Sequence, residues 1–323
     1  MTEQLIENLE QKIEDNQPVN EEEALAVLEV PAEELMDVLV LADRVRRREF
    51  GSSVHLCSIV NAKSGACSED CAFCAQSVHH RAEAETYGIR SAAEMIDSAR
   101  SAAELPISHF GIVTSGPKPG AEELKKIKKS ILEEPGEQIN WCASLGALDE
   151  PELRELKEAG LRRFHHNLET APGYFDEICT THSYDERVET VRTASRLGLE
   201  VCCGGILGLG ENNGHRVEFA RLLRELEVDS IPLNFLIPIP GTPLEEREAL
   251  SPSEILKIIA MFRLVNPTAE LKVCAGRKNL RDMQSMIFYA GATGIMIGDL
   301  LTVAGRAVEE DLQMLDDLGL DYE

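Results

Sequence analysis

The stretch "QINWCASLGALDEPELRELKEAGLRRFHHNLE", residues 138–169, contains a strand, a helix and a second strand in that order. Residues 138–145 and 162–169 are short β-rich runs, and residues 150–160 between them have a helical pattern. Strands that alternate with helices are typical of α/β proteins with a parallel sheet. This unit therefore predicts an α/β fold.

The same unit recurs along most of the chain. Eight short β-rich runs are present, and each is followed by a helix-like segment. The runs cover residues 53–60, 107–115, 138–145, 162–169, 199–207, 230–238, 270–276 and 294–298. The helix-like segments cover residues 91–104, 121–134, 150–160, 184–198, 215–227, 253–265, 279–291 and 309–319. This count predicts a (β/α)8 TIM barrel. A doubly wound open sheet is the alternative, because alternation does not prove closure.

The first fifty residues differ from the rest because they show helical patterns only. Asn20 can cap the segment that follows it, and a second helix begins near Pro31 and ends before Gly51. No long linker interrupts the later series. We therefore expect two units: an N-terminal helical extension over residues 1–50 that covers one end of the barrel, and one barrel domain over residues 51–323.

Composition limits the classes of function. The formal net charge is −25, which argues against nucleic-acid and anionic-membrane partners. Apolar residues make up 43% of the chain, but no run approaches the length of a membrane span. The acidic N-terminus does not resemble a secretory leader, so we expect a soluble cytoplasmic protein. Nine cysteines in such a protein indicate thiols kept for chemistry rather than disulfides.

Three of these cysteines lie in "SGACSEDCAFCAQS", residues 64–77. Cys67, Cys71 and Cys74 would share one face of a helix, so a stripe of core cysteines is one interpretation. A zinc site is a second, although structural zinc usually takes four protein ligands. A four-iron cluster held by three thiolates would leave one iron open. A small molecule with a free amine and a free carboxylate could chelate that iron.

The C-x3-C-x2-C spacing after the first barrel strand resembles the signature of the radical S-adenosylmethionine (AdoMet) enzymes. In that family AdoMet binds the open iron of a 4Fe-4S cluster, and an electron cleaves it to a 5′-deoxyadenosyl radical. The resemblance implies that Cys67, Cys71 and Cys74 hold this cluster. Phe73 matches the aromatic position that packs near the adenine.

Within these enzymes the chain resembles the biotin synthase family from about residue 40 to the end. The similar motifs are "SGACSEDCAFCAQS", "FHHNLET", "VCCGGILGLGE", "LNFLIPIPGTPL" and "CAGR", in the family's order. The resemblance implies radical insertion of sulfur into dethiobiotin, a sulfurtransferase reaction, with sulfur taken from an auxiliary iron–sulfur cluster. The implied AdoMet contacts are Asn167, Glu169, Arg187, Ile206 and Ser115. The implied substrate contacts are Asn234, Thr302 for the carboxylate, and His165, which replaces the family's asparagine.

The auxiliary cluster departs from the common family pattern. That pattern has cysteines on strands two, three and five and an arginine on strand seven, which hold a 2Fe-2S cluster. Here Cys142, Cys202 and Arg277 match, whereas Gly111 occupies the strand-two position and Cys274 replaces a serine on strand seven. We expect Cys142, Cys202 and Cys274 to share one interior layer, because alternate strands of a barrel supply each layer.

The form of the auxiliary cluster stays open at this point. A two-iron cluster would need Arg277 as its fourth ligand, whereas a four-iron cluster on three thiolates could carry an extra sulfide. Cys203 should point away from the interior when Cys202 points inward, because adjacent strand residues face opposite sides. Cys57 and Cys179 are assigned no role beyond packing.

Two other functions remain alternatives. One is another radical AdoMet enzyme of the same subgroup, such as a methylornithine synthase or a hydrogenase-maturase-like protein. The other is a non-catalytic iron–sulfur or zinc protein. If the enzyme interpretation holds, it implies a reducing partner such as flavodoxin or ferredoxin. A homodimer is compatible with the resemblance, but the sequence does not fix the oligomeric state.

Overall fold

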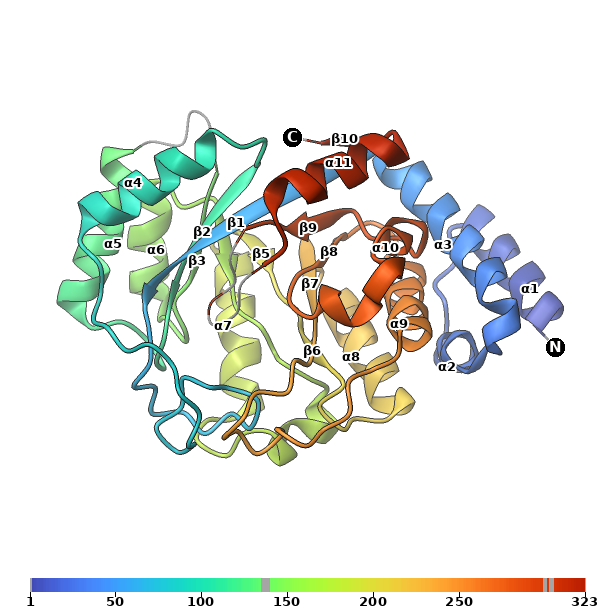
Figure 1. Ribbon diagram of the computed structural model, residues 1–323, viewed down its shortest axis with the longest axis horizontal. Coiled ribbons are helices and arrows are strands. Elements are labelled where there is room, and N and C mark those ends of the chain that lie inside the picture. The colour runs from blue at the N-terminus through green and yellow to red at the C-terminus, as the bar shows by residue number, and fades with distance from the viewer. Residues whose placement is uncertain (1, 135–139, 299–300, 302–304, 323) are drawn as a thin grey trace.

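Eight parallel strands close into a barrel, as the repeated strand–helix pattern predicts (Figure 1). The computed structural model describes residues 2–134, 140–298, 301 and 305–322. The barrel strands are β1 (Ser53–Lys63), β2 (His109–Thr114), β3 (Asn140–Ser144), β4 (Arg163–His165), β5 (Glu200–Cys202), β7 (Ser230–Phe235), β8 (Glu270–Val273) and β9 (Gly294–Met296). The first and last of them pair, with His55 opposite Gly294. This pairing excludes the open sheet.

The fifth barrel strand is interrupted. β5 ends at Cys202, and the chain resumes as β6 (Gly205–Leu207), which also pairs with β7. The two halves approach β7 so closely that a Cβ atom on Gly204 would lie 2.1 Å from the Pro232 carbonyl oxygen. Glycine is therefore required at the break, because any side chain would collide with backbone.

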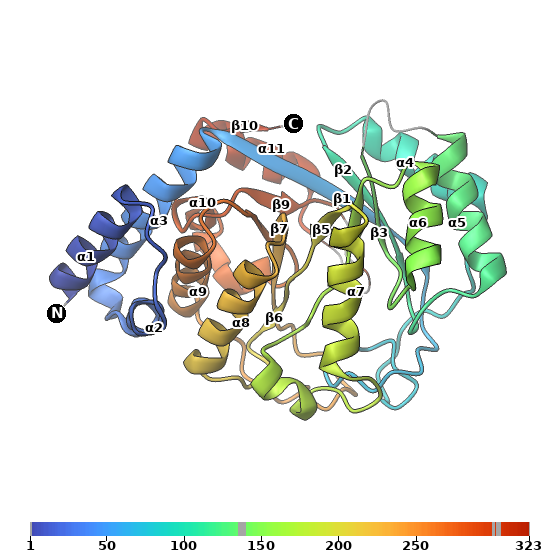
Figure 2. The same ribbon diagram turned by 180° about the vertical axis from the view of Figure 1, so that it is seen from behind.

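An outer ring of helices covers the barrel (Figure 2). It comprises α4 (Ala92–Ala103), α5 (Ala121–Glu133), α6 (Glu150–Ala159), α7 (Tyr184–Arg196), α8 (Asn213–Glu225), α9 (Pro252–Val265) and α11 (Val308–Leu318). The single helix expected over residues 279–291 is wrong. That stretch holds η3 (Arg277–Met283) and the one-turn α10 (Met286–Tyr289), because Arg281 has a positive φ of 52° that a helix cannot accommodate. A short η2 (Pro172–Glu177) precedes α7.

The N-terminal residues form α1 (Thr2–Glu14), α2 (Glu21–Glu29), η1 (Ala32–Glu34) and α3 (Leu35–Phe50). Asn20 caps α2 as expected, accepting a hydrogen bond from the backbone N–H of Glu23. α2 and α3 pack against α9, so they extend the outer ring at the side of the barrel (Figure 1). The division of the chain after residue 50 stays a prediction. A short β10 (Asp321–Tyr322) pairs with the start of β1.

A network of buried and partly buried charges lies at the N-terminal end of the barrel, where the strands begin. Arg163 binds Glu270 with two hydrogen bonds of 2.8 and 3.1 Å and donates a third, of 3.0 Å, to Glu200. Lys272 lies 3.1 Å from the same Glu270 carboxylate. Burial alone would raise the pKa of Glu270, but Lys272 and Arg163 outweigh burial and hold it well below its usual range. We call these four side chains the barrel floor.

In the part of the chain that the structure describes, no helix is both long and apolar enough to cross a bilayer.

Candidate functional site

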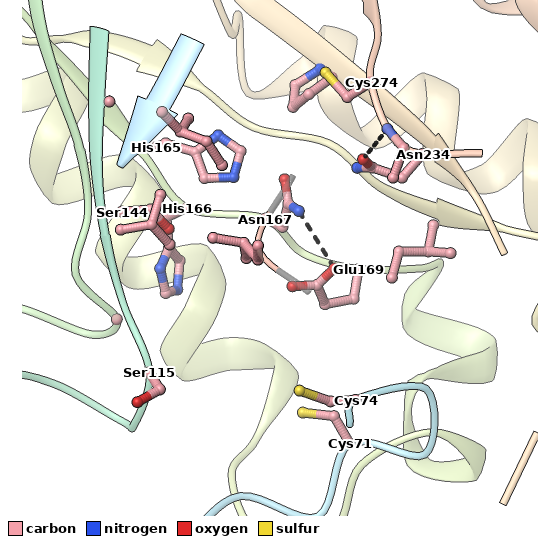
Figure 3. Close-up of a pocket in the computed structure, with 18 of the residues that line it drawn as sticks. Cys71, Cys74, Ser115, Ser144, His165, His166, Asn167, Glu169, Asn234 and Cys274 are labelled. Carbon is pink, nitrogen blue, oxygen red and sulfur yellow. Dashed lines mark hydrogen bonds between the residues drawn. The ribbon is translucent and has the colours of Figure 1, made fainter. Parts of the chain in front are cut away.

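A cavity of about 640 Å³ lies within the barrel, on the C-terminal side of the barrel floor. The expected side chains come to its wall from many strands, as in other barrels of this kind (Figure 3). The thiols of Cys71 and Cys74 approach from one side, and Cys274 lies on the far side. Asn167 and Glu169 lie between them.

The three-cysteine loop is not helical, which excludes the stripe of core cysteines. The Cys67 N–H donates to the Gln76 carbonyl, and the Cys74 N–H donates to the Cys71 carbonyl, both at 2.9 Å. Gly65 has a φ of 71°, and a Cβ atom there would lie 2.2 Å from the Thr86 hydroxyl. The loop is thus held by backbone contacts, and all three thiols line the cavity.

The donor set of the loop fits a cluster better than a single ion. The three sulfurs of Cys67, Cys71 and Cys74 are not all within 4.8 Å of one another. The ligand atoms of Cys71, Cys179 and His182, in contrast, are. One tetrahedral ion draws its ligands close together, but a cubane carries each thiolate on a different iron and spaces them apart. The loop therefore fits a 4Fe-4S cluster and does not fit a single zinc ion.

Three expected AdoMet contacts form one connected group. Asn167 donates from Nδ2 to Glu169 at 3.3 Å, and Arg187 donates to the same carboxylate at 3.3 Å (Figure 3). Arg187 also donates to the Asn167 carbonyl at 2.6 Å. Burial raises the pKa of Glu169 despite the nearby arginine. Each carboxylate oxygen of Glu169 accepts one of these hydrogen bonds and keeps a lone pair that can accept from a ligand hydroxyl.

The backbone at Glu169 is constrained by the next strand. Glu169 has a φ of 69°, and its carbonyl accepts from the Ile206 N–H at 2.7 Å. A Cβ atom on Gly205 would lie 2.2 Å from that carbonyl oxygen. A non-glycine residue in this region usually indicates a functional or strained site. Here the close approach of β6 fixes the direction of the Glu169 side chain.

Two further expected contacts share a small apolar cluster. Phe73 and Ile206 pack together with Ile178, Leu209 and Leu236 beside the loop. This is a suitable surface for the flat face of an adenine. Ser115 also lines the cavity, but its hydroxyl donates to the Gly65 carbonyl at 2.8 Å. It therefore anchors the three-cysteine loop.

The inner thiols gather as expected, with one addition. Cys142, Cys202 and Cys274 all line the cavity, and Cys203 points away into the core. Cys57, on the first barrel strand, lines the same cavity, although sequence reasoning assigned it to packing. Its place on β1 was the available signal, because odd-numbered barrel strands supply one interior layer. We call these four the inner thiols.

His165 changes the chemistry of one inner thiol. Its Nδ1 lies 3.3 Å from the sulfur of Cys202. Burial would raise the pKa of Cys202, but the charge and hydrogen bond of His165 lower it to about 7. Burial raises the pKa of Cys142 to about 12. Cys202 is therefore the inner thiol most ready to act as a thiolate ligand.

Arg277 lies outside the cavity wall that the inner thiols line, so its expected role as a cluster ligand stays a prediction. Its guanidinium binds the buried carboxylate of Asp311 on α11 at 2.9 and 2.5 Å and donates to the Met296 carbonyl. On β8, the positively charged side chain that lines the cavity is Lys272 of the barrel floor. It lies two residues before Cys274.

The ion pair between Arg277 and Asp311 leads to a prediction about stability. Asp311→Ala should lower the free energy of unfolding by about 3–5 kcal/mol, because it leaves the buried Arg277 without its partner. Denaturant unfolding followed by circular dichroism measures the change. Asp317→Ala, on the exposed face of α11, is the matched control and should change stability little. Equal effects of the two variants would contradict a structural role for the pair.

The expected substrate contacts are only partly visible. The Asn234 amide lines the cavity, accepting from the Ala275 N–H at 3.0 Å and donating to the Gly205 carbonyl at 3.1 Å (Figure 3). His165 also lines the cavity. Gly111 lines the cavity opposite Cys142, and a Cβ atom there would lie 3.1 Å from the Ile59 side chain and 3.8 Å from the Cys142 Cβ atom. Thr302 lies outside the described residues.

Two family models match the chain. The radical SAM superfamily matches residues 62–223, and the biotin and thiamin synthesis associated domain matches residues 232–321. A biotin synthase of Maridesulfovibrio salexigens is 53% identical over 303 residues, covering 94% of this chain and 93% of the relative. A biotin synthase of Geotalea uraniireducens is 48% identical, covering 98% of each chain.

Solved structures of more distant proteins share the fold. A methylornithine synthase superposes with a TM-score of 0.85 at 20% identity, covering 98% of this chain and 97% of its own. The hydrogenase maturase HydG from Carboxydothermus hydrogenoformans gives 0.83 at 17% identity, covering 100% of this chain and 80% of its own. At such identities the likeness shows the fold alone. The family assignment rests on the close relatives and on the two matched models: this chain belongs to the biotin synthase family of radical AdoMet enzymes, which implies a 4Fe-4S cluster and AdoMet as cofactors.

Proposed function

We propose that the protein is a biotin synthase that inserts sulfur into dethiobiotin, with the sulfur supplied by an auxiliary iron–sulfur cluster on the inner thiols. The observation that carries this proposal is the presence of two separate thiol sets in one cavity. Figure 3 shows Cys71 and Cys74 of the loop set on one side and Cys274 of the inner thiols on the other. A substrate between them could meet a radical from one set and sulfur from the other.

The chain's own residues prepare the loop side. When bound, the 4Fe-4S cluster and AdoMet supply the radical chemistry. Asn167, Glu169 and Arg187 would bind and orient the polar ends of AdoMet, since they form one connected group at the cavity wall. Phe73 and Ile206 would hold the adenine and exclude water from it.

The inner side is proposed to hold the auxiliary cluster on Cys142, Cys202 and Cys274. The proposed set leaves out Arg277, because Asp311 holds its guanidinium. A two-iron cluster needs four terminal ligands, and Cys57 would then have to be the fourth. A four-iron cluster needs only three thiolates and leaves room for an extra sulfide. We favour the four-iron form, since it uses the three strand positions and needs no arginine.

The substrate would lie beside His165 and Asn234, which both line the cavity. A reducing partner such as flavodoxin or ferredoxin, a homodimer and a cytoplasmic location stay predictions.

The proposed function is tested under anaerobic single-turnover conditions with AdoMet, a reductant and dethiobiotin. We expect biotin and 5′-deoxyadenosine to form together. Iron and sulfide counts with Mössbauer spectra of the same sample should show two cubane-type clusters per chain. Formation of 5′-deoxyadenosine without biotin would instead favour another radical AdoMet enzyme. Failure to form either product would contradict the enzyme assignment.

A further inference from the structure

A second group of ligand-type side chains lies beside the three-cysteine loop. Cys179, buried after η2, has its sulfur 3.8 Å from that of Cys71 and 3.3 Å from His182 Nδ1. Its sulfur is also 3.2 Å from a carboxylate oxygen of Asp70. Ligand atoms of Cys71, Cys179 and His182 all lie within 4.8 Å of one another, the one such group in the described part of the chain.

These spacings fit a single tetrahedral metal ion. Zinc bonds of about 2.3 Å to sulfur and about 2.0–2.1 Å to nitrogen imply S···S edges of about 3.8 Å and S···N edges of about 3.6 Å. The Cys71–Cys179 sulfur separation is 3.8 Å. The two ring nitrogens of His182 lie 3.3 and 3.8 Å from the Cys179 sulfur, on either side of the ideal edge.

The surrounding hydrogen bonds also suit a metal site. Glu69 accepts from His182 Nδ1, the carboxylate–histidine arrangement that leaves Nε2 free to bind a metal. Asp70 is held by the Thr180 N–H at 2.9 Å, which aims its other lone pairs at Cys179. Arg187 donates to Nε2 at 3.0 Å, so a bound ion would replace that hydrogen bond.

A cysteine–histidine nucleophile is the competing interpretation of the same residues. That arrangement needs the base to meet the thiol with one ring nitrogen and its orienting carboxylate with the other. Here Glu69 and the Cys179 sulfur both approach His182 Nδ1, and Arg187 occupies Nε2. The geometry therefore favours metal ligation over nucleophilic catalysis.

We propose that Cys71, Cys179 and His182 bind one divalent transition-metal ion of the Zn²⁺ type when the chain carries no cluster, with a solvent molecule in the fourth position. Binding releases the thiol protons of the two cysteines to solvent and involves no change of oxidation state. Glu69, Cys71 and His182 line the cavity, so an ion can enter from it. Because Cys71 belongs to both sets, the single ion and the AdoMet cluster exclude each other. This exclusion rests on the proposed assignment of Cys71 to the cluster, whereas the ion site itself does not.

The ion site is tested with Co²⁺ as the probe, added anaerobically to the full-length cluster-free chain. We expect one Co²⁺ per chain, with the visible d–d and near-ultraviolet thiolate charge-transfer bands of a tetrahedral site. Cys179→Ala and His182→Ala should each weaken binding by at least about 100-fold, more than the loss of an outer hydrogen-bond partner costs. Cys203→Ala removes a thiol buried elsewhere in the core and should leave the bands unchanged.

The variant Cys67→Ala distinguishes binding of Co²⁺ at the proposed site from binding of Co²⁺ by the three loop cysteines. The cobalt bands should survive in Cys67→Ala, because Cys67 is outside the proposed ligand group. Bands that vanish in Cys67→Ala and persist in Cys179→Ala would overturn the proposal. Two different ligand variants are used so that a folding defect in one, seen by circular dichroism, does not decide the result.

A separate experiment tests whether the single ion and the AdoMet cluster exclude each other. Chain preloaded with one equivalent of Zn²⁺ should take up iron and sulfide more slowly than ion-free chain, as followed by electron paramagnetic resonance of the reduced cluster. Cys179→Ala should take them up at the same rate with and without Zn²⁺. Equal slowing in both proteins would overturn the exclusion. Neither measurement uses dethiobiotin, so failure here is distinct from failure of the proposed function.

Discussion

Cys74→Ala is expected to abolish the formation of 5′-deoxyadenosine from AdoMet. Cys74 is one of the three thiols that line the cavity from the loop, and the proposed cluster uses all three. Loss of an outer-shell partner already costs about 10–100-fold at metal sites, so loss of a ligand should cost more than about 100-fold. Cys74 is preferred to Cys71 because it is outside the proposed single-ion site.

The measurement is anaerobic reduction with AdoMet, followed by chromatography of the products. Iron and sulfide counts on the same sample should show that the cubane of the loop is lost. Cys203→Ala is the matched control, since it removes a thiol of the core that does not line the cavity. Wild-type amounts of 5′-deoxyadenosine from Cys74→Ala would contradict the loop as the cluster site.

Cys274→Ala is expected to separate the two halves of the reaction. The variant should still cleave AdoMet, because the loop and its neighbours are intact. Biotin formation should fall by more than about 100-fold, since a ligand of the proposed auxiliary cluster is removed. Mössbauer spectra should show the loss of the auxiliary iron and the retention of the loop cluster. An unchanged auxiliary signal in Cys274→Ala would rule out this cysteine as a ligand.

The variant Cys57→Ala tests whether the auxiliary cluster has two irons or four. If three thiolates hold a four-iron cluster, Cys57→Ala should retain the auxiliary iron. If the cluster has two irons and needs a fourth thiolate, Cys57→Ala should lose it together with biotin formation. The two cysteines face the same cavity from different strands, so the pair of variants decides between the two forms.

Much of the fold could be predicted because each strand carried its own local signal. All eight expected runs contain strands of the barrel. Strand alternation also gave the opposite directions of Cys202 and Cys203, once the resemblance had placed Cys202 inward. The break at Gly204 could not be predicted, because it depends on the close approach of β7. The expected helix over residues 279–291 failed for a similar reason, since the positive φ of Arg281 has no strong sequence signal.

The candidate site shows the same division between local and long-range signals. The loop cysteines are close in sequence, so their spacing was informative. The role of Arg277 depends on Asp311, which lies 34 residues later, and no local pattern indicates that pairing. Cys179 and Cys71 are 108 residues apart, so their proximity appears only in three dimensions. The sequence therefore identified residues that belong to one motif. It did not identify pairs of residues that are close in the fold but distant in the sequence.

The barrel floor has a consequence for the movement of small molecules. Ion pairs among its four side chains connect the starts of β4, β5 and β8, so charged side chains occupy that end of the barrel. A small ion such as sulfide, if released near the inner thiols, would have to leave past the loop side, through the space that we propose for the substrate. Bound substrate would then block the exit of sulfide. The protein should therefore retain its labile sulfur longest when substrate occupies the cavity.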